Sequence, residues 1–555
     1  MKRTFVIVSM LWLVPCILVA QESSTKTVEV TRTYDPTLPD ANKINLVPRI
    51  TSDSARMMQN FTYMLRTIKP LSEGYLLNPV PPARVQREAP ARPESFQGYA
   101  RLGLGFSVST LLDAYVGGSN TSGFSWSLYA NHFGKYGDIT NDRKEAVSSL
   151  NMRNDIGLNL RKGFSNYTLA FNFGFAPRFV QYYGFDTTFS VKQYNRLAVD
   201  SIKQQYLKTY ATIEFAGRGK PEGWAYGATV SAYDFRAKNE RSEDALRLNV
   251  FAEKQVDSLL TFGLAVNNFN LFRSKALAKN NSIYFSLAPY GSYRGDWWKA
   301  SAKLDLTVAQ NDKTQAWFFP TLNFTALLLD DLFLPYLEIK GKYEANSFER
   351  LVNENPYISP YDTLDFYETR SYDFVLGIKG RYQSVLSYNV WVDYAILKDA
   401  VFFYNTTDLL GNYFNLLYDN GGRFSINGQL TANLSRAFEL QASYCYQNYD
   451  LDSLAHPLHK PEHLFTLQGR YNLWNKIVFG ADVDFRGGYY ALDLLSQNYR
   501  QRSSGCDVSL NAEYRFFDRS SLFLQLNNLL SSRYHAFNGY NTYGFNVLIG
   551  YAAIF

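Results

Sequence analysis

The last residues of the chain alternate between apolar side chains and small or polar ones. From Tyr543 to Phe555 every odd position is apolar, whereas the even positions begin with Gly544 and Asn546. Successive side chains of a β-strand point to opposite faces, so this period of two predicts a strand with one wholly apolar face that runs to the final residue. Such an apolar face must either be buried against another sheet, as in a β-sandwich, or be in contact with surroundings other than water.

The same alternation recurs from about residue 98 to the end of the chain. It is clear in 298–308, 423–434 and 506–516, where apolar residues recur at alternate positions. We count about 22 such segments, many of about 10–15 residues, whereas strands of globular proteins usually have about 5–6. Short connections such as 474–476 alternate with longer polar loops.

Strands of this length and number predict a membrane barrel rather than a soluble sandwich. A membrane-spanning strand needs about ten residues, with apolar side chains towards lipid and polar ones towards the lumen. Lipid-exposed backbone must be paired, so the sheet has to close on itself. We therefore predict an all-β fold: a transmembrane antiparallel β-barrel of about 22 strands in the outer membrane, with lipid around its wall. An even strand number places both termini in the periplasm.

A hydrophobic stretch opens the chain. It follows Lys2 and Arg3 and ends at Ala20, after which the sequence becomes polar. A basic start, a short apolar core and a small residue before the polar switch predict a secretory signal peptide over residues 1–20. We expect the protein to leave the cytoplasm.

Residues 21–97 differ in composition from the rest of the chain. They contain nine prolines and a single glycine. Proline removes backbone donors and fixes φ, so we expect an extended Pro-rich N-terminal segment, with the barrel over 98–555. The apolar residues between Phe61 and Leu71 are candidates for anchoring this segment inside the lumen or along its periplasmic rim. Folded-in surface loops and a separate partner are the alternative fillers of the lumen.

Composition adds few constraints on function. Aromatic residues make up 16% of the chain and charged residues 19%. Aromatic-rich loops such as 348–368 are candidate ligand contacts, although aromatic residues also form the girdle of a membrane barrel. The net charge of +6 includes two signal-peptide residues, so no nucleic-acid role is predicted.

Cys445 and Cys506 fall on opposite faces of their strands, which predicts no disulfide.

Catalytic, cofactor and metal chemistry find little support in the sequence. Three of the five histidines cluster in HPLHKPEH, as His456, His459 and His463. Pro457 and Pro461 interrupt this cluster, so we predict solvated loop histidines rather than a metal site. No nucleophile–base pair or pair of acids stands out, and we predict neither an enzyme nor a cofactor.

Three hairpin sequences resemble those of a known family. The segment LNNLLSSRYHAFNGYNTYGFNVLIGYAAIF, residues 526–555, resembles the closing hairpin of TonB-dependent outer-membrane receptors. The segments YDNGGRFSINGQLTANLSRAFELQASYCYQNYD and HKPEHLFTLQGRYNLWNKIVFGADVDFRGGYYA resemble earlier hairpins of the same barrels. The resemblance implies 22 strands, in agreement with the count above. It also implies that Tyr551 and Phe555 form the terminal signal that the barrel-assembly machinery recognises.

At its N-terminus the chain differs from this family. Such receptors carry a globular plug, which residues 21–97 are too short and too proline-rich to form, so the chain looks like a plug-less barrel of this group. TKTVEVTRTY, residues 25–34, is similar to the short box that contacts TonB. The implied function is solute uptake across the outer membrane, with TonB or a separate periplasmic or surface protein as partner. The alternative is a non-transporting scaffold that anchors such a partner.

Overall fold

A computed structural model describes residues 98–106, 109–185, 190–197, 202–218, 223–257, 259–311, 313–329, 331–406, 412–435, 437–493 and 498–555. All of them belong to one compact unit, Tyr63–Phe555. The predicted signal peptide and the Pro-rich segment, with its candidate anchors, lie outside the described residues.

In the described part of the chain, 22 strands form one antiparallel sheet. Their bounds are β1 (Gly98–Phe106), β2 (Ser109–Ser119), β3 (Phe124–Thr140), β4 (Ala146–Gly163), β5 (Tyr167–Gln181), β6 (Lys203–Arg218), β7 (Trp224–Ala237), β8 (Ser242–Gln255), β9 (Leu260–Arg273), β10 (Ser282–Arg294), β11 (Trp298–Gln310), β12 (Thr314–Ala326), β13 (Leu334–Glu344), β14 (Thr369–Tyr382), β15 (Leu386–Asn405), β16 (Phe414–Asn433), β17 (Phe438–Leu451), β18 (His463–Leu473), β19 (Ile477–Arg486), β22 (Gly505–Phe517), β23 (Ser520–Asn527) and β26 (Asn546–Ile554). The predicted fold class and strand number are confirmed.

The described connections also contain short elements of secondary structure. Two are small hairpins, β20 (Tyr489–Asp493) with β21 (Asn498–Arg502) and β24 (His535–Phe537) with β25 (Tyr540–Asn541). The others are the short helices α2 (Val191–Tyr194) and α4 (Phe348–Glu354). Among the described residues, no helix is long and apolar enough to cross a membrane.

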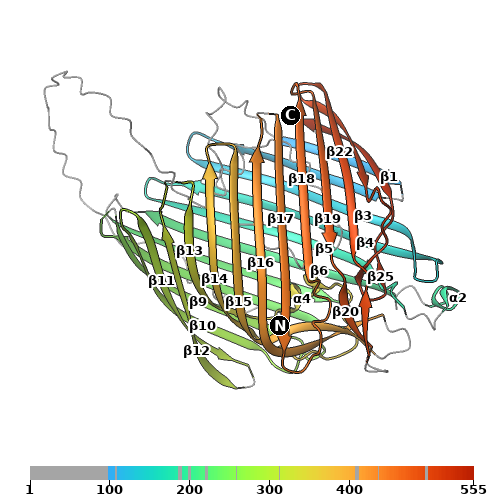
Figure 1. The fold of residues 1–555 in the computed structure, drawn as a ribbon, viewed down its shortest axis with the longest axis horizontal. Coiled ribbons are helices and arrows are strands. Elements are labelled where there is room, and N and C mark those ends of the chain that lie inside the picture. Colours follow the sequence, from blue (N-terminus) through green and yellow to red (C-terminus); the bar gives the residue numbers. More distant parts are fainter. Residues whose placement is uncertain are drawn as a thin grey trace. The chain divides into compact units, whose positions relative to one another are not determined.

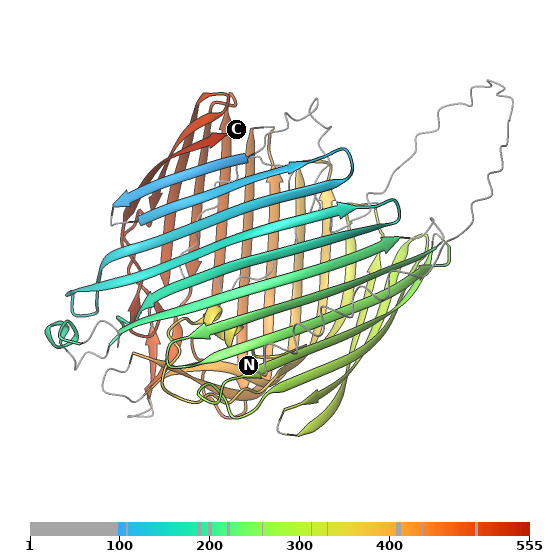
Figure 2. The ribbon, with the colours of Figure 1, turned by 180° about the vertical axis from the view of Figure 1, so that it is seen from behind.

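The first and last strands close the sheet into a barrel. β1 pairs with β2 on one side and with β26 on the other, with Leu102 opposite Tyr551. The final residue is part of this seam, because the Phe555 amide donates to the Gly98 carbonyl (3.0 Å) and the Gly98 amide donates to the Phe555 carbonyl (2.9 Å). β1, in blue, accordingly lies beside the last red strands (Figure 2).

The two faces of the wall follow the predicted alternation. On β22, Leu510 is 41% exposed on the outer face, whereas Asn511 is 6% exposed on the inner one. An apolar outer face and a polar inner face are what a membrane barrel requires. Cys445 is buried, Cys506 is half-buried, and both thiols are free, which confirms the absence of a disulfide between them.

The last strand starts later than its pattern predicts. β26 begins at Asn546, so Tyr543 lies in the preceding loop rather than on the outer face of the wall. Its hydroxyl hydrogen-bonds to the Ser149 hydroxyl (2.7 Å), and its ring packs against buried loop residues. At this rim, contacts with β4 and with residues far away in sequence compete with extension of the last strand.

Connections of two kinds alternate along the chain. Turns such as 164–166 and 383–385 join strands at the rim that holds Phe555, which we call the short-turn rim. Connections such as 345–368 and 528–545 lie at the other end, the long-loop rim. Helix α4 and the hairpin strands β20 and β25 lie at this second end, opposite the C-terminus (Figure 1).

Candidate functional site

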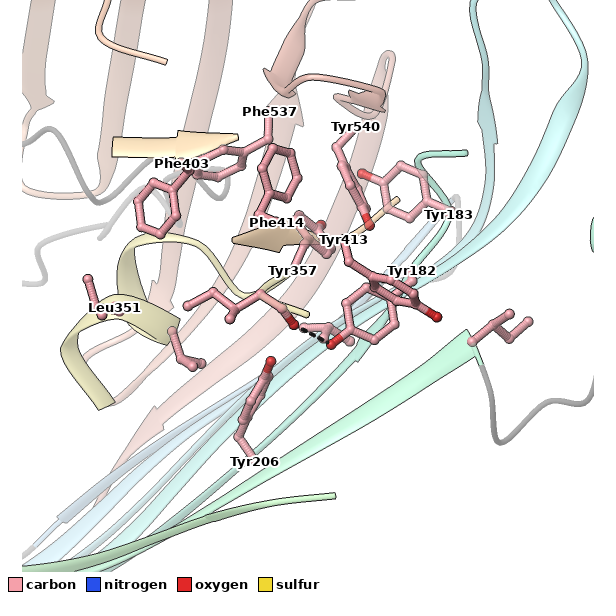
Figure 3. Close-up of a cluster of buried hydrophobic side chains, with 14 of the residues drawn as sticks. Tyr182, Tyr183, Tyr206, Leu351, Tyr357, Phe403, Tyr413, Phe414, Phe537 and Tyr540 are labelled. Carbon is pink, nitrogen blue, oxygen red and sulfur yellow. Dashed lines mark hydrogen bonds between the residues drawn. The ribbon is translucent and has the colours of Figure 1, made fainter. Parts of the chain in front are cut away.

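A buried aromatic cluster lies at the long-loop rim, and we call it the loop cap. Its members include Tyr182, Tyr183, Tyr194, Tyr357, Phe414, Phe537 and Tyr540. They come from the loops after β5, β13 and β23 and from the start of β16. Figure 3 shows the labelled rings of the cluster, among them Tyr357, Phe414 and Tyr540, gathered together with Leu351 of α4 beside them. The rings of Tyr357 and Tyr540 stack with centroids 3.6 Å apart.

Polar contacts join the same loops across the barrel. The Tyr182 hydroxyl donates to the Ile358 carbonyl (3.0 Å), and the Tyr183 hydroxyl donates to the Asn541 carbonyl (2.9 Å). The first of these contacts joins the β5–β6 loop to the β13–β14 loop, and six strands of the sheet, β7 to β12, lie between them. The loop cap therefore connects loops from separate parts of the barrel rim.

Burial fixes the protonation of these hydroxyls. It raises the pKa of Tyr357 to about 12 and holds the pKa of Tyr182 and Tyr540 well above the ordinary tyrosine value. The hydroxyls are consequently neutral donors at physiological pH. Buried tyrosines normally need a partner for this group, and backbone carbonyls of neighbouring loops supply it for Tyr182 and Tyr540.

Helix α4 is attached to the barrel wall at its first turn. Ser347 caps the helix by accepting from the Arg350 amide (3.2 Å). The Glu243 carboxylate accepts from the Phe348 amide (2.9 Å) and from the Arg273 guanidinium (2.9 Å). Both side chains of this ion pair are almost fully buried, and a carboxylate at a helix N-terminus is favoured by the helix dipole.

Further charged contacts hold the rest of this loop. The Arg178 guanidinium donates to the Val352 carbonyl near the end of α4 (3.2 Å), and Arg241 donates to the Ser359 carbonyl. Lys460, in the loop after β17, forms an ion pair with Glu354 at 2.8 Å. We call these contacts, together with Glu243 and Arg273, the α4 latch.

The histidine cluster corrects a sequence-based prediction. His459 is 2% exposed rather than solvated, and its ring packs against Phe414 and Phe537. Its Nδ1–H donates to the Phe403 carbonyl (3.0 Å), and its Nε2 accepts from the Asn538 amide (3.3 Å). Burial lowers the pKa of His459 to about 3, so the ring is neutral. Within the described ranges, no three His, Cys, Asp or Glu side chains gather as a metal site would require.

Two adjoining cavities lie on the inner wall beside α4. Their volumes are about 580 Å³ and about 440 Å³, which is the size range of small-molecule sites. Both are lined by Asp305, Tyr343, Glu344 and Arg350. Polar and charged side chains line both cavities, and aromatic rings contribute to the smaller one, so the cavities suit a solute with polar groups.

The predicted assembly residues lie away from this site. Tyr551 is 42% exposed and Phe555 54% exposed, and both belong to the outer face of the closing seam. Phe555 marks the short-turn rim. Sequence reasoning missed the loop cap and the α4 latch, and the one signal for them was the aromatic-rich loop 348–368, which carries α4 and Tyr357.

Comparisons with known proteins identify the fold alone. No family model and no curated protein matches the chain. Among solved structures, it is similar to the siderophore receptor PirA from Acinetobacter baumannii, with 13% identity and a TM-score of 0.65 over 84% of this chain and 81% of that one. It is also similar to the FrpB iron transporter from Neisseria meningitidis, with 10% identity and a TM-score of 0.64 over 83% and 82% of the two chains.

A third similar structure is the ferripyoverdine receptor of the outer membrane of Pseudomonas aeruginosa, bound to ferripyoverdine. It shares 13% identity with a TM-score of 0.60, over 84% of this chain and 73% of that one. Two of these structures are receptors and one is an iron transporter, and at 10–13% identity the similarity concerns the fold. The chain therefore has a 22-stranded barrel that resembles those of TonB-dependent outer-membrane receptors.

Proposed function

We propose that this protein is an outer-membrane uptake receptor that admits a polar solute when the loop cap opens. The observation that carries the proposal is the loop cap itself, which connects loops from separate parts of the barrel rim beside the two cavities. A barrel of this strand number encloses a wide lumen. The presence of the loop cap across this lumen distinguishes a gated receptor from an open pore. Solute-sized cavities on the inner wall favour the receptor over the scaffold.

The remaining parts of the proposal concern orientation and partners. Residues 1–20 are removed as a signal peptide, 21–97 form the Pro-rich segment, and 98–555 form the barrel. Both termini face the periplasm, so the long-loop rim faces the outside. The barrel-assembly machinery recognises Tyr551 and Phe555, and residues 25–34 contact TonB. The similarity to receptors supports this arrangement at the level of the fold.

The α4 latch gives the test. Glu243→Gln removes the negative charge of a buried ion pair and leaves the Arg273 guanidinium without its counter-ion. Breaking such a pair from one side costs about 3–5 kcal/mol. We expect the loop cap to open more often, which would appear as higher conductance in planar bilayers and faster entry of bulky antibiotics into cells.

The matched control is Glu145→Gln, an identical change at the same rim. Glu145 pairs with Arg143 at 3.3 Å, and both side chains are partly exposed. Exposed pairs contribute about 0–1 kcal/mol, so conductance should stay at the wild-type level. If Glu243→Gln folds and remains as closed as this control, the loop cap is not the gate, and the anchoring-scaffold alternative replaces the uptake receptor.

A further inference from the structure

The smaller cavity is lined by two neighbouring rows of inward-facing side chains. Strand register places Arg247, Phe269 and Tyr284 in one row across β8, β9 and β10. The next row, nearer the short-turn rim, holds the polar residues Asn249, Asn267, Ser286 and Thr307. We call this surface the lumenal chamber. One row offers a cation and aromatic faces, and the other offers amides and hydroxyls.

Arg247 supplies a positive charge in the lumenal chamber that no carboxylate of the described residues neutralises. Its guanidinium lies over the Phe269 ring, 4.4 Å from the centroid. The neighbouring charges are neutralised: Arg350 pairs with Glu344 at 2.8 Å, and Asp305 pairs with a lysine on its own strand at 3.2 Å. Among the described residues, no carboxylate forms an ion pair with Arg247. A guanidinium packed on a ring through its carbon still has N–H groups that a carboxylate can accept from.

Tyr343 supplies a second unused group. Its ring lies 5.0 Å from that of Tyr284 and 5.9 Å from that of Phe319. The three rings form an aromatic corner of the smaller cavity, and Tyr343 also lines the larger one. Its hydroxyl oxygen is buried and has no hydrogen-bond partner in the described part of the chain. Buried polar groups are normally satisfied, so a hydroxyl in this position is suited to contact a bound molecule.

We propose that the lumenal chamber binds a ring-shaped solute that carries a carboxylate and several hydroxyl groups. The carboxylate would pair with Arg247, the hydroxyl groups would bond to the amide and hydroxyl row, and the apolar face of the ring would stack on the aromatic corner. The cavity volume of about 440 Å³ accommodates such a molecule. This inference rests on the proposed uptake function and names the chemical class of its solute.

The test is direct binding to the purified full-length protein in detergent, measured by calorimetry. Galacturonate is the probe, galactose tests the need for the carboxylate, and benzoate tests the need for the hydroxyl groups. We expect galacturonate to bind at least tenfold more tightly than either control compound. Arg247→Gln should weaken galacturonate binding at least tenfold, and Arg247→Lys should weaken it less.

Arg236→Gln is the matched control variant. Arg236 lies on the outer wall, paired with Asp234 at 2.7 Å, so its loss should leave galacturonate binding unchanged. Heat-modifiable migration on gels reports whether each variant is folded. If Arg247→Gln does not fold, Tyr343→Phe removes only the unpartnered hydroxyl and should weaken binding severalfold.

Several outcomes overturn the inference. They are an absence of galacturonate binding, equal binding of galactose, and binding that folded Arg247 and Tyr343 variants leave intact. Failure here is distinguishable from failure of the uptake proposal. A protein that binds none of the probes, but whose Glu243→Gln variant conducts, remains a gated receptor for another solute. If the wild type binds galacturonate but its Glu243→Gln variant does not conduct, the lumenal chamber remains supported as a binding site, whereas the loop cap is not supported as a gate.

Discussion

Acidification should open the loop cap, because His459 is buried in its neutral form. Its Nδ1–H and its Nε2 lone pair are both used, by the Phe403 carbonyl and the Asn538 amide. A proton added to Nε2 would point at the Asn538 N–H, so two donors would face each other. Lys460, Arg502 and His535 add positive charge around the ring and disfavour its protonation further.

The size of the effect follows from the pKa of His459. The pKa falls from about 6.5 in an unfolded chain to about 3 in the folded protein. Between these values the unfolded state binds more protons, so stability is intact above about pH 6.5 and declines as the pH falls towards 3. At about 1.4 kcal/mol per pKa unit, the full loss is about 4–5 kcal/mol. Because His459 packs against rings of the loop cap, we expect this loss of stability to affect the loop cap first.

The assay compares the wild type with His459→Gln between pH 7 and pH 4. Glutamine keeps one donor and one acceptor but does not titrate. For the wild type we expect conductance to rise and amide hydrogen exchange at Asn538 to accelerate as the pH falls, with a far flatter response in the variant. Equal pH dependence in the two proteins would show that His459 is not the responsible group. Asp142 does not interfere, because the His535 hydrogen bond lowers the pKa of Asp142 to about 2, below this range.

Two further predictions concern the wall. Leu510→Arg on the outer face should destabilise the barrel by about 2–4 kcal/mol in urea titrations if the site lies near the bilayer midplane, whereas Asn511→Arg on the inner face should be nearly silent. Equal losses would contradict the assigned faces. Phe555→Asp should sharply lower the amount of folded, heat-modifiable barrel, because it removes the proposed assembly signal at the closing seam; unchanged surface levels in a cell-fractionation experiment would exclude that role.

The strands of the wall could be predicted from the sequence, because each strand shows its two faces within its own short stretch of residues. The alternation that separates Leu510 from Asn511 is visible in a single strand, and lipid on one side with the lumen on the other makes it regular. The loop cap could not be predicted in this way. The Tyr182–Ile358 contact joins residues 176 positions apart, and no periodicity marks it. His459 looks solvated between two prolines, because the rings that bury it come from β16 and the loop after β23.

The position of Tyr540 within the chain has a consequence for the order of assembly. The loop that carries it precedes β26, and the Tyr183–Asn541 contact beside it spans 358 residues. Closing so long a loop is entropically costly until the strands between have paired. A nascent barrel that stalls before β26 docks would therefore lack these partners of the loop cap and stay permeable. Pairing of β26 with β1 and formation of the loop cap would then occur in the same step of assembly.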